Sequence, residues 1–440
     1  MSNTQRLIDR QERLGRPVRV GIVGAGQMGS GLVAQVHRAR GLEISVVADV
    51  AVDRAVQALQ AAGREDVDRA ADVAEAARII ESGRAAVLDD GLRLAELPVD
   101  IVMEVSGIPD VAAQVALSCI LAGKDVALMT VEADVTVGLL LGRMATAGGS
   151  VYTICRGDEP VECLKLVEYA EDLGLEVIVA GKGKNNPMRP TDVPEDVEEE
   201  ARRKGMNPKM LCSFTDGTKT QIEMAALANA TGYRIETPGM HGEAVDLADL
   251  TAVLRPQAEG GIITGTGPVV EYVTGDVAPG VFVIVRSDSE VITRELEYLH
   301  LDGRDGVFAL YRPFHLASVE APLSIGEAVL DRRASFRSEH WRAEVVATAK
   351  SDLAAGTVLE GIGGHHVHGT TLDADQARAE DLLPIGIAAS STLLRDVPAG
   401  QRLTYADVEI DESRPLVAMR RMQDALLTSG IVPTAGPATR

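Results

Sequence analysis

The chain has 440 residues, a length typical of two or three domains rather than of a single hydrophobic core. Its 46% hydrophobic content is ordinary for a globular protein, and its formal net charge of −22 argues against nucleic acid or an anionic membrane as a partner. The four cysteines show no metal-binding spacing, and no apolar run is long enough for a secretory signal or a membrane span. We therefore expect a cytoplasmic protein with reduced thiols that acts on a small-molecule substrate.

The first predicted strand, residues 18–23, runs directly into a glycine-rich turn with the spacing GxGxxG. A helical pattern and a second strand at residues 42–49 follow this turn. This order predicts a dinucleotide-binding unit, in which the turn approaches the pyrophosphate and the N-terminus of the helix binds it. The residues predicted to bind the cofactor here are Gly24, Gly26, Gln27, Met28 and Gly29. A strand-to-helix turn that merely prefers glycine is the alternative.

An acidic residue, Asp49, stands at the end of the second strand. A carboxylate in this position accepts hydrogen bonds from the adenosine ribose and repels a 2′-phosphate, so it favours NAD over NADP. Arg54, five residues later, would soften that repulsion, and NADP therefore remains open.

Strands and helices alternate to residue 156, which predicts an α/β fold with an N-terminal Rossmann domain, a doubly wound parallel sheet, over residues 1–156. Residues 66–98 look like a mostly helical insertion into this domain. Ligands of such sheets bind at the carboxyl ends of the strands, so we expect the nicotinamide over "EVSG" (104–107). Ser106, Gly107 and Glu132 are the cofactor-binding residues predicted there.

The pattern changes after residue 156, and mixed strands and helices predict an α+β catalytic and dimerisation domain over residues 157–335. Within it, a strand at 175–180 precedes "GKGKNNP", which we interpret as a loop. Lys182 and Lys184 would point to the same side of an extended chain, lower each other's pKa and attract an anion.

One of these lysines would then serve as proton donor or acceptor during hydride transfer, facing the nicotinamide together with Asp158 and Glu132. Asn185 and Asn186 would bind substrate hydroxyl groups. A solvated basic turn is the alternative interpretation of this segment.

Other candidate site residues lie on both sides of this loop in the sequence. Asp158 and Glu159 lie between a strand and a helix. They would act as helix caps, as substrate ligands or as ligands of Mg²⁺ or Mn²⁺. Lys219 and Glu223 are four residues apart on a predicted helix and would face the same way, in a site or in a surface salt bridge.

Arg312 and His315, in "YRPFHL", would bind a phosphate or shuttle a proton, although a structural role fits them equally well. Residues 343–415 predict a small β-rich domain, because short apolar strands alternate with tight turns. Its "GGHHVHG" segment is interpreted as a surface loop rather than a metal site. Residues 416–440 predict a helix and a disordered tail.

Five separated motifs resemble a known family: VEADVTVG (131–138), GDEP (157–160), GKGKNNP (181–187), DGTKTQIEMAALANATG (216–232) and RPFHL (312–316). They are similar to the homoserine dehydrogenase superfamily, closest to the 1-deoxy-D-xylulose 5-phosphate reductoisomerase-like enzymes of isoprenoid biosynthesis. Residues 343–415 resemble a SAF domain. The resemblance implies an NAD(P)-dependent oxidoreductase that forms a homodimer, and it adds Asn229 to the site.

The most specific activity that the resemblance implies is that of a reductoisomerase acting on a small, hydroxylated and phosphorylated substrate. Reductoisomerases of this type use NADPH, whereas Asp49 in this chain favours NAD. The alternatives are a homoserine-dehydrogenase-like dehydrogenase of another small hydroxy acid or polyol, and a catalytically idle nucleotide-sensing protein.

Overall fold

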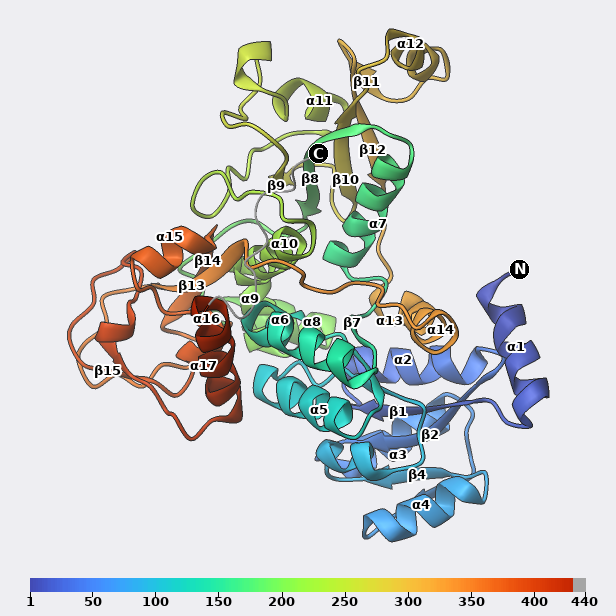
Figure 1. The fold of residues 1–440 in the computed structure, drawn as a ribbon. Coiled ribbons are helices and arrows are strands. Elements are labelled where there is room, and N and C mark those ends of the chain that lie inside the picture. Colours follow the sequence, from blue (N-terminus) through green and yellow to red (C-terminus); the bar gives the residue numbers. More distant parts are fainter. Residues whose placement is uncertain (430–440) are drawn as a thin grey trace. The chain divides into compact units, whose positions relative to one another are not determined.

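The computed structural model describes residues 1–429 and consists of two compact units, each assembled from separate stretches of the chain (Figure 1). Unit 1 contains Met1–Asp158, Leu316–Arg337 and Arg414–Ala425, and unit 2 contains Glu159–His315, Ser338–Ser413 and the chain from Leu426. Within residues 1–429, we find no helix that has both the length and the apolar character needed to cross a bilayer.

Unit 1 is built on a seven-stranded parallel sheet with the order β3-β4-β2-β1-β5-β6-β7. The strands are β1 (Val18–Val23), β2 (Leu42–Ala48), β3 (Val67–Arg69), β4 (Ala85–Leu88), β5 (Ile101–Glu104), β6 (Asp125–Leu128) and β7 (Tyr152–Ile154). Strands β4, β5 and β6 bury every residue, so both faces of the sheet are covered, as in other parallel sheets. The predicted doubly wound Rossmann sheet is confirmed.

Unit 1 also contains several helices, some of which cover this sheet. They are α1 (Asn3–Leu14), α2 (Gln27–Arg38), α3 (Val52–Ala61), α4 (Val73–Glu81), α5 (Pro109–Leu121), α6 (Val131–Gly148), α13 (Ala317–Glu320), α14 (Pro322–Asp331) and most of α17 (Pro415–Thr428). Apolar residues of α2, α3 and α14 pack with β1 and β2 in one core cluster. The tail predicted after α17 lies beyond residue 429, outside the described residues.

Residues 66–98 are an integral part of the sheet rather than an insertion. Strand β4 pairs with β2, and β3 pairs with β4 at the edge. The sequence pattern is weak here because β3 has only three residues, none of them buried, and a helix with a strong apolar face, α4, dominates the segment.

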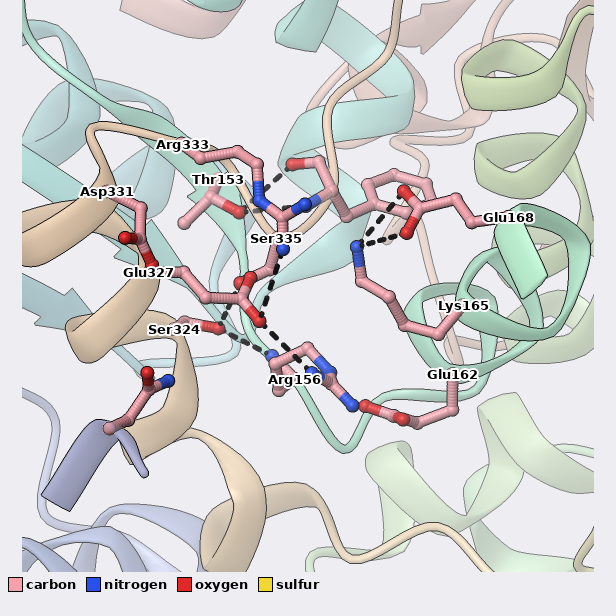
Figure 2. Close-up of polar contacts among 12 residues, drawn as sticks. Thr153, Arg156, Glu162, Lys165, Glu168, Ser324, Glu327, Asp331, Arg333 and Ser335 are labelled. Atoms are coloured by element: carbon pink, nitrogen blue, oxygen red, sulfur yellow. Dashed lines mark hydrogen bonds and ion pairs between the residues drawn. The ribbon is translucent and has the colours of Figure 1, made fainter. Parts of the chain in front are cut away.

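The segment 316–337 returns to unit 1 from a distant part of the sequence and is held by polar contacts (Figure 2). The Arg156 N–H donates to Ser324 Oγ at 2.8 Å, and the Arg156 guanidinium lies 3.1 Å from Glu327 Oε1. The backbone N–H of Phe336, whose side chain is buried, donates to Thr153 Oγ1 at 3.0 Å. These contacts fix α14 against the end of the parallel sheet.

Unit 2 contains a mixed five-stranded sheet with the order β11-β12-β10-β8-β9. The strands are β8 (Glu176–Lys184), β9 (Val269–Thr274), β10 (Val281–Arg286), β11 (Gly303–Arg304) and β12 (Val307–Arg312). Strand β8 pairs in parallel with β9 and antiparallel with β10, so it is a central strand. The predicted α+β character of this region is confirmed.

The helices of unit 2 are short, apart from two that pack on the sheet. They are α7 (Glu159–Asp172), α8 (Glu198–Lys204), α9 (Pro208–Thr215), α10 (Thr218–Thr231), α11 (Leu250–Val253), α12 (Glu290–Tyr298), α15 (Ala374–Ala379) and α16 (Ile385–Ala388). Helix α7 packs on β8 and β10, and α10 packs on α7 and β9. Central strand β8 therefore lies close to both long helices of the unit.

The β-rich residues after 343 form two small antiparallel pairs within unit 2. These are β13 (Ala343–Ala349) with β14 (Val367–Asp373), and β15 (Thr392–Leu393) with β16 (Val408–Glu409). The small β-rich module is confirmed, although His368 belongs to β14 and not to a surface loop. Its assignment as a SAF domain stays a prediction.

A buried lysine ties this module to the start of α10. The Lys350 Nζ lies 2.8 Å from Asp216 Oδ2 and donates to the carbonyl oxygens of Asp192 and Gly364 at 2.6 and 2.7 Å. Both charged side chains are inaccessible to solvent. Strand β14 adds a hydrogen bond from the Gly369 N–H to Thr218 Oγ1, so the module holds the first turn of α10 in place.

We expect Lys350→Met to lower the free energy of unfolding by roughly 3–5 kcal/mol, because it leaves the Asp216 carboxylate buried without its partner. Urea unfolding followed by circular dichroism measures this change. The control is Lys204→Met, which removes a solvent-exposed pair with Glu200 and should cost less than about 1 kcal/mol. Equal costs for the two variants would contradict the structural role of Lys350.

Candidate functional site

The glycine-rich turn of unit 1 lies at the point where the strand order reverses, between β1 and β5. Gly24 follows β1 with a φ of +102°, and a Cβ on it would lie 2.8 Å from the Val105 carbonyl oxygen. A Cβ on Gly29, inside α2, would lie 2.2 Å from the Gly24 carbonyl oxygen. These two glycines therefore let the turn, the helix and the end of β5 pack against one another.

Gly26 differs, because a Cβ on it would meet no atom within 4 Å. It is the N-cap of α2, and no side chain caps this helix end. Gln27 and Met28, in the first turn of α2, are exposed. The open side of Gly26 and the uncapped N–H groups of α2 are therefore the features that a dinucleotide pyrophosphate requires.

Asp49 follows β2, as predicted, and its carboxylate is held by the backbone around it. The Oδ2 atom accepts from the Ala25 N–H at 2.8 Å and the Oδ1 atom from the Ala51 N–H at 2.8 Å. Each oxygen keeps a second lone pair, with which it can accept a hydrogen bond from a ribose hydroxyl group. The Arg54 guanidinium lies 3.9 Å away and is more than half exposed.

The end of β5 presents the other predicted cofactor residues. The Ser106 N–H donates to Glu104 Oε1 at 2.8 Å, and the Gly107 N–H donates to Thr130 Oγ1 at 3.1 Å. Gly107 has a φ of +70°, which favours glycine. Glu132 lies in the first turn of α6, close to this edge.

The second group of predicted residues forms an ion cluster in unit 2. The Lys182 ammonium, on β8, lies 2.8 Å from Glu159 Oε1 at the start of α7 and pairs as well with Glu223 on α10. The Lys182 and Glu223 side chains are buried, and Glu159 is nearly so. The "GKGK" segment is thus part of central strand β8, and its lysines are buried rather than solvent-facing, contrary to our prediction of a loop.

Glycine alternates with lysine here because other backbone presses on the opposite side of the strand. A Cβ on Gly181 would lie 2.0 Å from the Glu271 carbonyl oxygen, and one on Gly183 would lie 2.3 Å from the Ala278 nitrogen. Side chains alternate along a strand, so the lysines share the other side, which faces α7 and α10. The predicted shared side of Lys182 and Lys184 is therefore present.

Electrostatics within the cluster separate the two lysines. Burial alone would lower the pKa of Lys182, but the carboxylates of Glu159 and Glu223 outweigh it and raise this pKa. Burial, followed by the repulsion from Glu159, raises the pKa of Glu223. Burial and then the nearby Lys182 charge lower the pKa of Lys184 to about 8. The predicted mutual lowering therefore holds for Lys184 alone.

Lys184 is engaged with the main chain. Its Nζ donates to the carbonyl oxygens of Asn186, Phe214 and Pro187 at 2.7, 2.8 and 3.4 Å. An ammonium group has three N–H donors, so these contacts occupy all of them. Lys184 therefore braces the chain around Phe214, and the Asn186 backbone takes part in this brace, while Asn185 is exposed beside it.

His315 joins the cluster from the end of the segment after β12. Its Nε2 lies 3.2 Å from Glu159 Oε1, the oxygen that Lys182 also contacts. About a fifth of the His315 side chain is exposed, so the contacts run from the buried ammonium through Glu159 to solvent. This arrangement can carry a proton between a bound substrate and water.

The remaining predicted catalytic residues fall in different places. Lys219 lies one turn before Glu223, and its charge partly offsets the rise in the Glu223 pKa, in keeping with the four-residue spacing. Arg312 pairs with Glu162 on α7 and lies over the Phe314 ring.

Asn229 stands six residues after Glu223, about 9 Å along α10 and on another face of the helix. Its Oδ1 accepts from the backbone N–H groups of Arg342 and Ala343, both at 2.8 Å. The Nδ2 donates to the Ala343 carbonyl oxygen at 3.1 Å. These contacts hold the start of β13, so Asn229 lies outside the cluster, in contrast to its predicted role.

Asp158 and Glu159, predicted as metal ligands, are neighbours at the boundary of the two units. The carboxylate oxygens of Glu159 and Glu223 lie within 4.8 Å of each other, a spacing that suits a divalent cation. The Lys182 ammonium already supplies a positive charge to both groups, so the side chains as arranged do not fit a resident metal.

Sequence reasoning missed two buried charged residues. Glu104 ends the otherwise apolar strand "IVME", and Lys350 follows the apolar strand "AEVVATA". In each case the signal was a single charge at the end of a buried strand. Such a charge is costly to bury unless it has a specific partner or role.

The comparison with protein families agrees with the location of this cluster. Residues 157–321 match the family described as the catalytic domain of oxidoreductase DRL. The protein is an oxidoreductase. The matched segment includes Glu159, Lys182, Glu223 and His315, and we found no curated protein that matches the chain.

Solved structures show a distant likeness. Myo-inositol dehydrogenase from Corynebacterium glutamicum is 12% identical with a TM-score of 0.42, over 72% of this chain and 89% of that one. Myo-inositol dehydrogenase from Lactobacillus casei, in complex with NAD(H) and myo-inositol, is 16% identical with a TM-score of 0.38, over 67% and 74%. The NADPH complex of 1-deoxy-D-xylulose 5-phosphate reductoisomerase from Zymomonas mobilis is 17% identical with a TM-score of 0.34, over 48% and 58%.

We expect Lys182→Met to lower the free energy of unfolding by about 3–5 kcal/mol at pH 8, because Glu159 and Glu223 are then buried without a cation. Without the ammonium, the pKa of Glu223, which is already raised, should rise further. A carboxyl group whose pKa is higher in the folded than in the unfolded state destabilises the folded protein increasingly as the pH rises. The deficit measured by urea unfolding should therefore be smaller at pH 5 than at pH 8.

The double variant Lys182→Met/Glu223→Gln is the matched control for this prediction. It removes one of the two repelling charges and should recover much of the stability at pH 8. A double variant no more stable than the single one would show that charge repulsion is not the cause.

Proposed function

We propose that the protein is an NAD(P)-dependent dehydrogenase of a small hydroxylated substrate, such as a polyol or a hydroxy acid. The observation that carries the proposal is the Lys182 ammonium bound by two carboxylates, one of which also contacts His315. This cluster lies in the segment that matches an oxidoreductase catalytic domain, and the same chain provides a Rossmann unit.

The Rossmann unit supports the choice of cofactor. The open side of Gly26 and the uncapped N-terminus of α2 would receive the pyrophosphate, and Asp49 would accept the ribose hydroxyls. The carboxylate favours NAD, and the exposed Arg54 nearby would be the group that tolerates NADP. When bound, the nicotinamide would accept or donate the hydride.

The chain itself would manage the charge and the proton. Lys182 uses two of its three N–H donors on Glu159 and Glu223, and the third would donate to the substrate oxygen. Because its pKa is raised, Lys182 stays an ammonium and stabilises the alkoxide that forms as the carbinol proton leaves. Glu159 and His315 would pass that proton to solvent.

The balance of charge around the cluster favours a neutral substrate over a phosphorylated one. Lys182 is paired with two carboxylates, and Arg312 is paired with Glu162. Little positive charge is left uncompensated for a phosphate dianion. The family match specifies an oxidoreductase and adds no support for the reductoisomerase activity, so the dehydrogenase alternative is the better supported one. The homodimer stays a prediction.

Turnover tests the function directly, with a panel of polyols, hydroxy acids and sugar phosphates and with NAD and NADP as acceptors. For a substrate found in this way, Lys182→Met should lower kcat/KM by about 10²–10⁴-fold, because the charge beside the reacting oxygen is lost. Lys184→Met should lower it by about tenfold or less, because its donors serve the backbone.

Cofactor affinity should survive both substitutions, because the pyrophosphate site lies on Gly24–Gly29. Equal losses of kcat/KM in the two lysine variants would contradict the assignment of Lys182. A complete lack of turnover across the panel would contradict the proposed substrate class.

Gly26→Ala tests the cofactor site separately. A Cβ at this position meets no protein atom, so the stability should be unchanged, but it would occupy the approach of the pyrophosphate. We expect NADH to bind at least about tenfold more weakly, measured by fluorescence titration. An unchanged affinity would exclude this turn as the pyrophosphate site.

The same titration with Asp49→Ala tests the cofactor preference. NADH binding should weaken more than NADPH binding, because only NADH keeps the adenosine 2′-hydroxyl group that can donate a hydrogen bond to the carboxylate. An equal loss for the two cofactors would remove the argument for NAD.

A further inference from the structure

Glu104, the last residue of β5, is a buried carboxyl group at the reversal point of the parallel sheet. It stands in register with Val23, the last residue of β1, and with Leu128, the last residue of β6. Gly24 follows Val23 directly, and a Cβ on it would touch the Val105 carbonyl oxygen. The glycine-rich turn and the end of β5 are therefore in contact.

The position of Glu104 in the sheet indicates which half of the cofactor would lie nearest to it. Asp49, the predicted adenosine ligand, follows β2 on one side of β1, and Glu104 ends β5 on the other side. A dinucleotide crosses this point at the carboxyl ends of the strands, so its nicotinamide half belongs over β5.

The hydrogen bonding of Glu104 is incomplete. Its Oε1 accepts from the Ser106 N–H at 2.8 Å, whereas its Oε2 is buried and has no hydrogen-bond partner among the described residues. The residue as a whole is fully inaccessible to solvent. A buried carboxyl oxygen in this condition is costly unless the group is neutral or a ligand supplies what is missing.

The groups that face Glu104 add no positive charge. Glu132 and Asp134 lie on α6, Tyr152 lies on β7 and donates to Asp134 Oδ1 at 2.9 Å, and Cys155 follows β7. Burial raises the pKa values of Tyr152 and Cys155 well above their usual range, so both stay neutral near pH 7. Burial raises the pKa of Glu104 to about 7, against the opposing effects of Ser106 and Thr130, and the nearby Glu132 carboxylate adds to the rise.

We propose that Glu104 distinguishes the oxidised from the reduced nicotinamide by its own charge. The inference rests on the proposed NAD(P)-dependent function. The oxidised ring is positively charged and is attracted by the ionised carboxylate, whereas the reduced ring is neutral and gains nothing from it. Binding of the oxidised cofactor lowers the pKa of Glu104, so near pH 7 it releases protons from those molecules in which this group was still protonated, and binding of the reduced cofactor releases none.

The sign of the pH dependence follows from this linkage. A nearby positive charge lowers the pKa of a carboxyl group, so the oxidised cofactor must bind more tightly when Glu104 is ionised. As the pH rises through about 7, the ratio of the dissociation constants of NAD⁺ and NADH should fall. A lowering of the Glu104 pKa by one unit on binding corresponds to a tenfold fall in this ratio.

The experiment measures the dissociation constants of NAD⁺ and NADH between pH 5.5 and 8.5 for the full chain, by fluorescence and calorimetry. The wild type should show about a tenfold fall in the ratio. Glu104→Gln keeps the shape of the side chain but cannot ionise, so its ratio should be constant with pH. Glu132→Gln removes the neighbouring acid on α6 and should keep the pH dependence.

Three outcomes separate the hypotheses. A wild-type ratio that is constant with pH, while both cofactors bind, overturns the role of Glu104 and leaves the dehydrogenase proposal intact. If Glu132→Gln abolishes the pH dependence and Glu104→Gln preserves it, the effect belongs to Glu132, and the role of Glu104 is overturned as well. Failure of NAD⁺, NADH, NADP⁺ and NADPH alike to bind at any pH overturns the proposed function and this inference with it.

Discussion

The ammonium of Lys182 is shared by carboxylates from two different helices, and the arrangement of unit 2 depends on that shared charge. Strand β8 contributes the cation, and α7 and α10 contribute one acid each. Two carboxylates buried within 4.8 Å of each other would repel strongly without a cation between them. In the proposed function the same arrangement leaves the ammonium, held by two acids, with one N–H donor for a substrate oxygen.

The cluster also depends on parts of the chain that contain no site residue. Gly181 and Gly183 allow the backbone around Glu271 and Ala278 to approach β8 closely, which leaves the lysines on the side that faces the helices. On α10, the hydrogen bond from the Thr371 N–H to Gln221 Oε1 adds to the anchor that Lys350 provides. The small β-rich module therefore positions the helix that carries Glu223.

Much of unit 1 could be predicted from the sequence, because its information is local. Strand, glycine turn, helix and strand follow one another within about 30 residues, and the two strands are mostly apolar because both faces of the sheet are covered. The return of residues 316–337 to unit 1 could not be predicted in this way. It depends on contacts such as Arg156 with Glu327, which are 171 positions apart in the chain.

The candidate site also has some features that local sequence could predict and others that it could not. Spacing alone placed Lys182 beside Lys184 and Lys219 beside Glu223, because strand and helix periodicity decide which side chains share a face. Spacing could not show that acids from α7 and α10 would raise the pKa of one lysine while three carbonyl oxygens would engage the other. Nor could it show that Asn229 serves β13, since its partners lie more than 110 positions away.

The overall charge of the chain affects which ligands these local arrangements can bind. With a net charge of −22, the protein repels an anionic ligand at long range, and dinucleotides are anions. Binding of such a cofactor must therefore rely on short-range donors, and the uncapped N–H groups of α2 beside the open Gly26 are of that kind. A neutral polyol meets no such repulsion. The near balance of acids and bases around Lys182 is thus consistent with a substrate that brings no charge of its own, and in the proposed function the negative charge of the cofactor would be received by the uncapped N-terminus of α2.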